Sequence, residues 1–183
     1  SAEEVDFVSA LAATASLALE ESSRAQSEHL LRESEERFSK AFHTSPVNIT
    51  IVRLSDKKFI EANDAFVRWF GLRREDILGR DSQELGIWAN LEDRVKFLAD
   101  LERNGSVREV ECRLRTSLGS VHTIVQSADI IEINREPHML VIGLDISQRK
   151  HAEAELLRTL AREKELGQLR SNFVSMISHE FRT

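Results

Sequence analysis

Glycine and proline are absent from residues 1–45, and this absence constrains the fold more than any other feature. Because both residue types break helices, the segment is predicted to form one long helix or two. Apolar residues recur in it at three- and four-residue spacing, first at Val8 and Leu11 and again at Leu31 and Phe38. A helix of this length would span on the order of 60 Å. Such a length favours a two-chain coiled coil.

Two strands and two short helices are predicted after Pro46. The apolar residues Ile49, Ile51 and Val52 form one short strand and Phe59-Ile60 begin a second, with turn residues at 55–57 between them, as in a β-hairpin. Apolar residues then recur at helical spacing in two segments, and each segment ends in residues typical of a helix C-terminus. Asn63 is predicted to be the N-cap of the first of these helices. The segments are 65–70, closed by Gly71, and 91–103, closed by Asn104-Gly105.

Three more strands are predicted before Asp145. Around 110–114 apolar and charged residues alternate, which indicates a strand with one solvated face. Residues 121–133 and 139–144 are apolar at odd and even positions, which predicts burial on both faces. Short helices would cover one face of the sheet, and the N-terminal helix or a partner subunit the other. The predicted fold is α+β: a five-stranded antiparallel sheet with short helices, flanked by long coiled-coil-like helices.

Helical periodicity resumes after Leu144 and continues to the end of the chain. Asp145 is predicted to be the N-cap of this helix, with Gln148 as its capping-box partner. An apolar stripe then follows, formed by Leu166, Leu169, Phe173, Ile177 and Phe181.

Charge and composition narrow the partners that we expect. Acidic residues outnumber basic ones by 31 to 25, so the net charge of −6 argues against nucleic acid and anionic membranes. No apolar run approaches the about 18 residues of a membrane span, and residues 1–10 lack the order of a signal peptide. We expect a cytoplasmic segment without direct membrane contact, with any anchor upstream of Ser1. Cys112, the only cysteine, fits a small apolar residue in a strand.

Five short motifs resemble, by their order and spacing, those of the PAS domain family. The resemblance runs from about Glu36 to Lys150, and we assign residues 36–146 to a PAS sensor domain. The motifs are E-R-F at 36–38, S-P-V at 45–47, F-I-E-A-N-D-A-F at 59–66, G-L-R-R-E-D-I-L-G-R at 71–80 and D-I-S-Q-R-K at 145–150.

The C-terminal sequence S-N-F-V-S-M-I-S-H-E-F-R-T at 171–183 resembles the histidine box of sensor histidine kinases. The resemblance implies that these residues begin a dimerisation and phosphotransfer helix and that residues 147–170 form a coiled-coil linker. Residues 1–35 would be an N-terminal signalling helix. Its segment 5–21 resembles the final helix of a GAF domain, and a generic alanine-rich helix fits the same residues.

The resemblance makes His179 the phosphoacceptor. Helical geometry points its side chain away from the predicted seam residues Ile177 and Phe181, which leaves the ring accessible. An imidazole with a pKa near about 6.5 is largely neutral in the cytoplasm and offers a nucleophilic nitrogen. Glu180 is the candidate acid/base group that fixes the tautomer and removes the proton. In the family, the position of Thr183 orients water during phosphatase activity.

The partners implied by the resemblance are proteins. They are a second copy of the chain through parallel helices, the kinase catalytic domain of a parent protein and a response regulator receiver domain. No G-x-x-x-x-G-K-[ST] motif occurs, and no Gly-rich nucleotide-binding region follows the histidine box. We expect ATP to bind only in that catalytic domain, so the fragment alone would be inactive.

The identity of any PAS ligand stays open at this point. Cys112 lies in a strand, whereas the flavin type needs a reactive cysteine in the helical region, and residues 91–103 lack the histidine of the haem type. We predict no metal site and no certain cofactor, and we keep a small-molecule ligand as an expectation. Its candidate pocket residues are Trp69, Trp88, His122, Ile124 and Gln126, with core packing as the alternative for both tryptophans. Alternative functions are a haem or flavin sensor and a non-catalytic dimerisation scaffold.

Overall fold

The computed structural model describes the backbone of residues 2–180 and the side chains of residues 23–170, Asn172 and Met176. The chain divides into two units, residues 1–46 and 47–183, each described here by itself. Unit one consists of α1 (Ala2–Thr44), one continuous helix as the absence of glycine and proline predicts. On α1, Leu31 and Phe38 of the predicted seam are 61% and 62% exposed.

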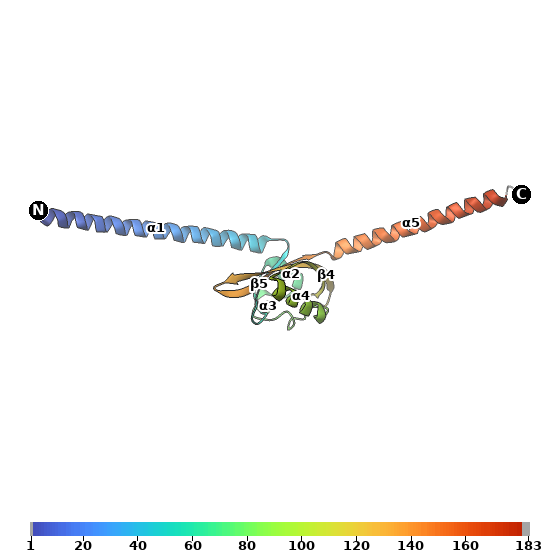
Figure 1. Ribbon diagram of the computed structural model, residues 1–183, viewed down its shortest axis with the longest axis horizontal. Helices are drawn as coiled ribbons and strands as arrows, with labels where there is room; N and C mark the ends of the chain where they lie inside the picture. The colour runs from blue at the N-terminus through green and yellow to red at the C-terminus, as the bar shows by residue number, and fades with distance from the viewer. Residues whose placement is uncertain (1, 181–183) are drawn as a thin grey trace. The chain divides into compact units, whose positions relative to one another are not determined.

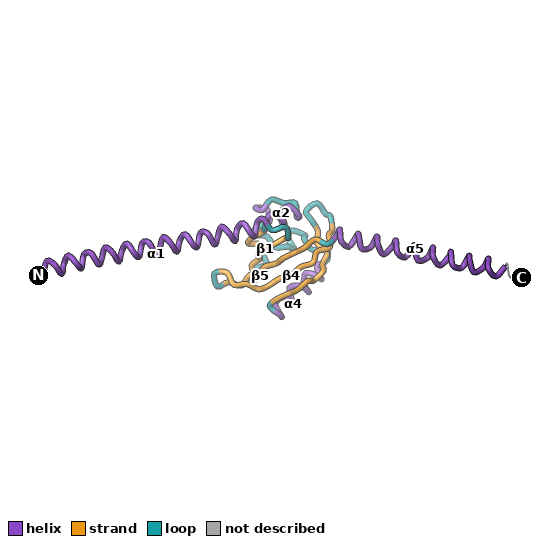
Figure 2. Tube along the Cα trace, turned by 90° about the horizontal axis from the view of Figure 1, so that it is seen from above, coloured by secondary structure: helices purple, strands orange, loops and turns teal. Residues whose placement is uncertain are grey.

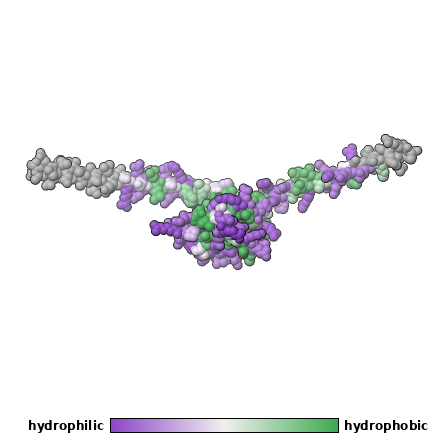
Figure 3. All heavy atoms as spheres, in the orientation of Figure 1, coloured by the Kyte–Doolittle hydropathy of each residue, from purple (hydrophilic) through white to green (hydrophobic). Residues whose placement is uncertain are grey.

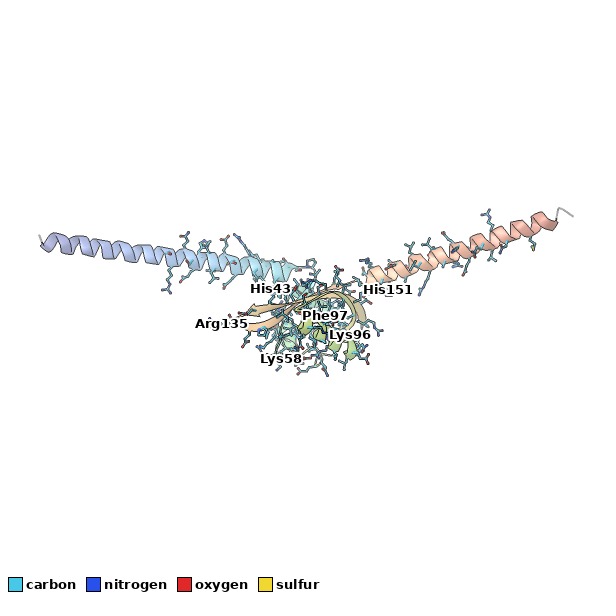
Figure 4. The ribbon with its side chains drawn as sticks, in the orientation of Figure 1. His43, Lys58, Lys96, Phe97, Arg135 and His151 are labelled. Atoms are coloured by element: carbon cyan, nitrogen blue, oxygen red, sulfur yellow. The ribbon has the colours of Figure 1, made fainter. Side chains whose placement is uncertain are left out.

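The second unit contains a five-stranded antiparallel sheet with the order β2–β1–β5–β4–β3 (Figures 1 and 2). The long β4–β5 hairpin turns at Asn134 and Arg135, both in the left-handed region, and Figure 4 labels Arg135 at its tip. The predicted α+β fold with an antiparallel sheet is therefore confirmed. The strands are β1 (Asn48–Arg53), β2 (Phe59–Ala62), β3 (Ser106–Arg115), β4 (Val121–Ile133) and β5 (Glu136–Asp145).

Three short helices connect β2 to β3: α2 (Asp64–Phe70), α3 (Arg74–Ile77) and α4 (Leu91–Asn104). Asn63 is the N-cap of α2, and its side-chain oxygen accepts from the Phe66 N–H at 3.0 Å, as predicted. Gly71 and Gly105 end α2 and α4 with φ angles of 86° and 73°, a conformation that favours glycine.

The core lies between these helices and one face of the sheet. Phe66, Phe70 and Phe97 from the helices pack against strand residues such as Val52 and Ile124, all at most 6% exposed. Figure 4 labels Phe97 beside the sheet. The short helices cover only one face of the sheet. The burial of β4 and β5 on both faces stays a prediction, because it requires the N-terminal helix or a partner subunit as the second cover. On the other face Ile142 and Leu144 of β5 are 41% and 52% exposed.

The last element is α5 (Ser147–Glu180), a continuous helix that Gly167 does not interrupt. Figure 3 shows apolar surface along its described part. The exposed apolar side chains there are between 52% and 65% accessible: Leu156, Leu157, Leu160, Leu166, Leu169 and Met176. None of the described helices combines the length and the apolarity that crossing a membrane requires.

Candidate functional site: a core cavity and the junction with α5

Two small cavities lie between the sheet and the short helices. Their volumes are about 50 and 20 Å³. Both are lined by Thr50 on β1, Phe66 on α2, Leu114 on β3, Gln126 on β4 and Val141 on β5. The larger cavity has room for roughly four waters, and drug-sized ligands occupy about 300–1,000 Å³. The space therefore matches a molecule of few atoms.

Most of the wall of the larger cavity is apolar, and two polar side chains interrupt it on the sheet. Thr50 is only 5% exposed, and among the described residues its hydroxyl has no hydrogen-bond partner. Every fully enclosed side-chain nitrogen or oxygen in the described chain does have a partner, so the Thr50 hydroxyl must keep surface towards a cavity. The Gln126 carbonyl oxygen accepts from the Cys112 thiol, with the two atoms 3.3 Å apart. Its amide N–H groups remain available to the cavities that it lines.

Two cations border the larger cavity, and each is paired. Arg94 donates to Asp81 at 2.7 Å and to the Ser82 hydroxyl at 3.2 Å, with the Arg94 and Asp81 side chains 13% and 16% exposed. The Lys57 ammonium donates to Glu102 at 2.8 Å and to a backbone carbonyl. The cavity wall thus carries no uncompensated formal charge.

Asp145, the last residue of β5, makes hydrogen bonds to three other residues at the junction with α5. Its Oδ1 accepts from the Ser147 N–H at 2.8 Å. Its Oδ2 accepts from the Trp69 indole N–H at 3.2 Å and lies 2.8 Å from Nδ1 of His122. Because a carboxylate can only accept, that histidine nitrogen carries the proton. One side chain therefore connects α2, β4 and the first turn of α5.

The electrostatics of the junction favour the ionised carboxylate. Partial burial raises the pKa of Asp145, but the hydrogen bonds from Ser147 and Trp69 and the attraction to His122 together outweigh it. The resulting pKa lies below the ordinary value of 3.8. A second connection closes the same turn, since the Ser147 hydroxyl accepts from the Thr123 N–H at 2.9 Å.

The predicted capping geometry at this junction needs a correction. The Lys150 N–H donates to the Ile146 carbonyl, so Ile146 occupies the N-cap position and Asp145 precedes it by one residue. The reason is that Asp145 still belongs to the β4–β5 ladder, where it pairs with Ile124. Gln148 is exposed in the first turn of α5, and in the described chain its side chain makes no hydrogen bond.

Trp69 connects the junction with the cavities. Its ring lines the smaller cavity, 6.0 Å from the ring of Phe66, which lines both. The N–H of the same indole donates to Asp145, and the His122 ring packs edge-on against the indole, with the ring centroids 5.8 Å apart. A change of shape inside the cavity can therefore reach α5 through one side chain.

The structure distributes the predicted pocket residues over two places. Trp88 lines the larger cavity, Trp69 and Ile124 the smaller one, and Gln126 both. His122 lines neither and belongs to the junction. Thr50 and Arg94 were not predicted as pocket residues. A threonine in a strand and an arginine on a helix carry no local signal, because only the fold brings them to one cavity.

The predicted phosphotransfer residues lie outside the described side chains. The backbone of His179 and Glu180 belongs to the last turn of α5, and Thr183 is outside the described residues altogether. In the described part of the chain, no group of three or more His, Cys, Asp or Glu residues could hold a metal ion. Cys112 is 4% exposed, and its burial raises the pKa of the thiol to about 12, so it stays protonated.

Comparisons with known proteins point to one family. The sequence profile of the PAS domain family matches residues 46–148, more than half of the chain. A search of curated protein sequences found no match.

Three solved structures illustrate the similarity. The PAS domain of an HTR-like protein from Haloarcula marismortui has a TM-score of 0.57 and 22% identity, covering 67% of this chain and 99% of that one. A domain of a sensory box sensor histidine kinase/response regulator from Geobacter sulfurreducens has a TM-score of 0.52 and 19% identity, covering 63% and 96%. An RNA-binding light-oxygen-voltage receptor has a TM-score of 0.58 and 20% identity, covering 72% and 38%. At these identities the likeness shows the fold alone.

Proposed function

The chain belongs to the PAS domain family, and from this premise we propose that it is the input segment of a two-component sensor histidine kinase. A signal received in the PAS domain passes through the linker part of α5, residues 147–170, to the phosphoacceptor His179. The observation that carries the proposal is the histidine-box sequence at 171–183. It follows the PAS domain in the chain, and α5 runs from Ser147 at the end of that domain to Glu180 within the box.

The junction supports the relay step. Asp145 holds the first N–H of α5 and is itself held by Trp69 and His122 from the domain. Lys150, in the first turn of α5, forms an ion pair with Glu111 of β3 at 2.9 Å. A shift of α2 or of the sheet therefore acts directly on the start of the helix.

A parallel homodimer would cover the exposed apolar residues of α5. Burying a leucine side chain contributes about 1.5–3 kcal/mol, so a second copy of the same helix is a fitting partner. Glu163, Lys164 and Gly167 interrupt the apolar seam between Leu160 and Phe173. Such an interrupted seam permits two helix registers, which a switch requires.

The test uses the chain extended through the second helix of the phosphotransfer hairpin, with the kinase catalytic domain and ATP supplied separately. We expect acid-labile, base-stable phosphate on the extended protein and none on its His179→Gln variant. His151→Gln is the matched control, because His151 is exposed on the same helix (Figure 4) but outside the motif. The unextended chain should be a poor acceptor, since its motif lacks the second helix. Labelling of the His179→Gln protein would refute the assignment.

The two alternative functions receive less support. A haem or flavin sensor needs a pocket several times larger than the about 50 Å³ of the principal cavity. A colourless protein after cofactor-replete expression would argue against it. A dimerisation scaffold with an incidental His179 would keep the homodimer but show no phosphate transfer to that residue in the extended protein.

A further inference from the structure

The charged residues that border the larger cavity favour a neutral ligand over a carboxylate. A carboxylate ligand would need a cation, and both bordering cations are already engaged, Arg94 with Asp81 and Lys57 with Glu102. Taking Arg94 away from Asp81 would leave a buried carboxylate without its partner. Breaking a buried ion pair in this way is strongly destabilising. A neutral molecule avoids this loss because it leaves both pairs intact.

The sheet side of the cavity supplies hydrogen-bonding groups that the protein itself leaves unused. The Thr50 hydroxyl can donate or accept, and the Gln126 amide can donate. Both residues line both cavities, from β1 and β4, the two strands that flank β5 in the sheet. The opposite wall is mainly apolar and includes Ile87, Phe97 and Leu98. A ligand fits this arrangement if it has one uncharged polar end and a short apolar body.

We propose that the cavity binds a small neutral amphiphile, such as a short primary amide or alcohol, with its polar end at Thr50 and Gln126. The available volume admits roughly four or five non-hydrogen atoms. The proposal rests on the sensor function proposed above and names the class of molecule that the sensor detects. Short carboxylates of the same size are rejected because the site offers them no free cation.

The two methionines provide a built-in reporter and control. Met139 lines the larger cavity, and Met176 is exposed on α5. We would label both methyl groups with ¹³C in the full 183-residue chain and titrate it with propionamide, 1-propanol and propionate. Propionamide and propionate have the same shape and differ in charge. The first two ligands should shift the Met139 signal saturably and leave Met176 in place, and propionate should shift neither.

A substitution at the proposed polar contact completes the test. Thr50→Val keeps the side-chain volume and removes the hydroxyl, so the affinity for propionamide should fall about fivefold. Thr123→Val is the matched control, because Thr123 is a strand residue that lines neither cavity, and it should bind as the wild type does. Tighter binding of propionate than of propionamide, or no saturable shift with either neutral ligand, would overturn the inference. The titration involves no phosphate transfer, so ligand binding without any labelling of His179 would refute only the proposed function.

Discussion

Replacing Asp145 by Asn should destabilise the second unit and weaken the connection to α5. The amide can still accept from Ser147 through its remaining oxygen. Its NH₂ group, however, would face the Trp69 N–H, so that hydrogen bond is lost, and His122 keeps its bond only by accepting at Nδ1 from a neutral amide in place of the carboxylate. A hydrogen bond to a charged group contributes about 1.5–3 kcal/mol when it is buried. The Asp145 and His122 side chains are each 31% exposed, and screening reduces the expected total to about 1–2 kcal/mol.

The effect of this substitution should depend on pH. The folded-state pKa of Asp145 lies below the ordinary 3.8, so its contribution is present above that value and is lost as pH falls through the lower folded-state pKa. A protonated carboxyl resembles the amide. The difference in unfolding free energy between wild type and Asp145→Asn should therefore be full at pH 7 and shrink below pH of about 4.

Urea unfolding followed by tryptophan fluorescence between pH 7 and pH 3 measures both expectations. Asp129→Asn is the control, because its pair with Arg108 is exposed, at 59% and 48% for Arg108 and Asp129, and should contribute at most about 0.5 kcal/mol. The reasoning fails if Asp145→Asn destabilises no more than Asp129→Asn at pH 7. It also fails if the loss stays the same at both ends of the pH range.

Three further outcomes can be measured directly. Asn63→Ala should lower the unfolding free energy by about 3 kcal/mol, because the fully buried Asn63 side chain bonds the backbone of Ile49, Phe66 and Val47; a loss below about 1 kcal/mol in urea unfolding would contradict this. The Cys112 thiol, with its pKa raised to about 12, should react with a thiol reagent at pH 8 at least about a hundredfold more slowly in the folded chain than in urea, and comparable rates would show that the site is open. Light scattering should detect a concentration-dependent dimer that Leu160→Asp weakens about tenfold or more, and a wild-type monomer at high micromolar concentration would exclude pairing through α5.

Local patterns predicted most of the fold. The strand at 121–133 has the boundaries expected from the turn residues on either side, and Asn63 caps α2 as its position before an apolar helical run indicates. The capping prediction at Asp145 was wrong by one residue because the ladder with β4 extends to Asp145. Pairing across a sheet is a long-range property, and a capping motif read along the sequence does not contain it.

The site was harder to predict because it depends on position along a strand. His122, Ile124 and Gln126 were all predicted as pocket residues, and because they alternate on β4 they share one face of the sheet. The cavities lie beside Ile124 and Gln126, whereas His122 pairs with Leu114 nearer the strand's start and meets Asp145 there. Thr50 became recognisable only when the register placed it opposite Val141, on the wall of both cavities.

The separation of cavity and junction also determines how strongly one can act on the other. Trp69 is the described side chain that lines a cavity and bonds to Asp145, so displacement of its indole by a ligand would cost the junction one partly exposed hydrogen bond. That bond contributes about 0.5–1 kcal/mol, because the carboxylate acceptor is ionised but partly screened. A coupling of about 1 kcal/mol changes an equilibrium roughly fivefold, the lower end of what allosteric proteins use. In the proposed parallel dimer, two copies would each contribute this term to a shared helix register, so the two contributions would add.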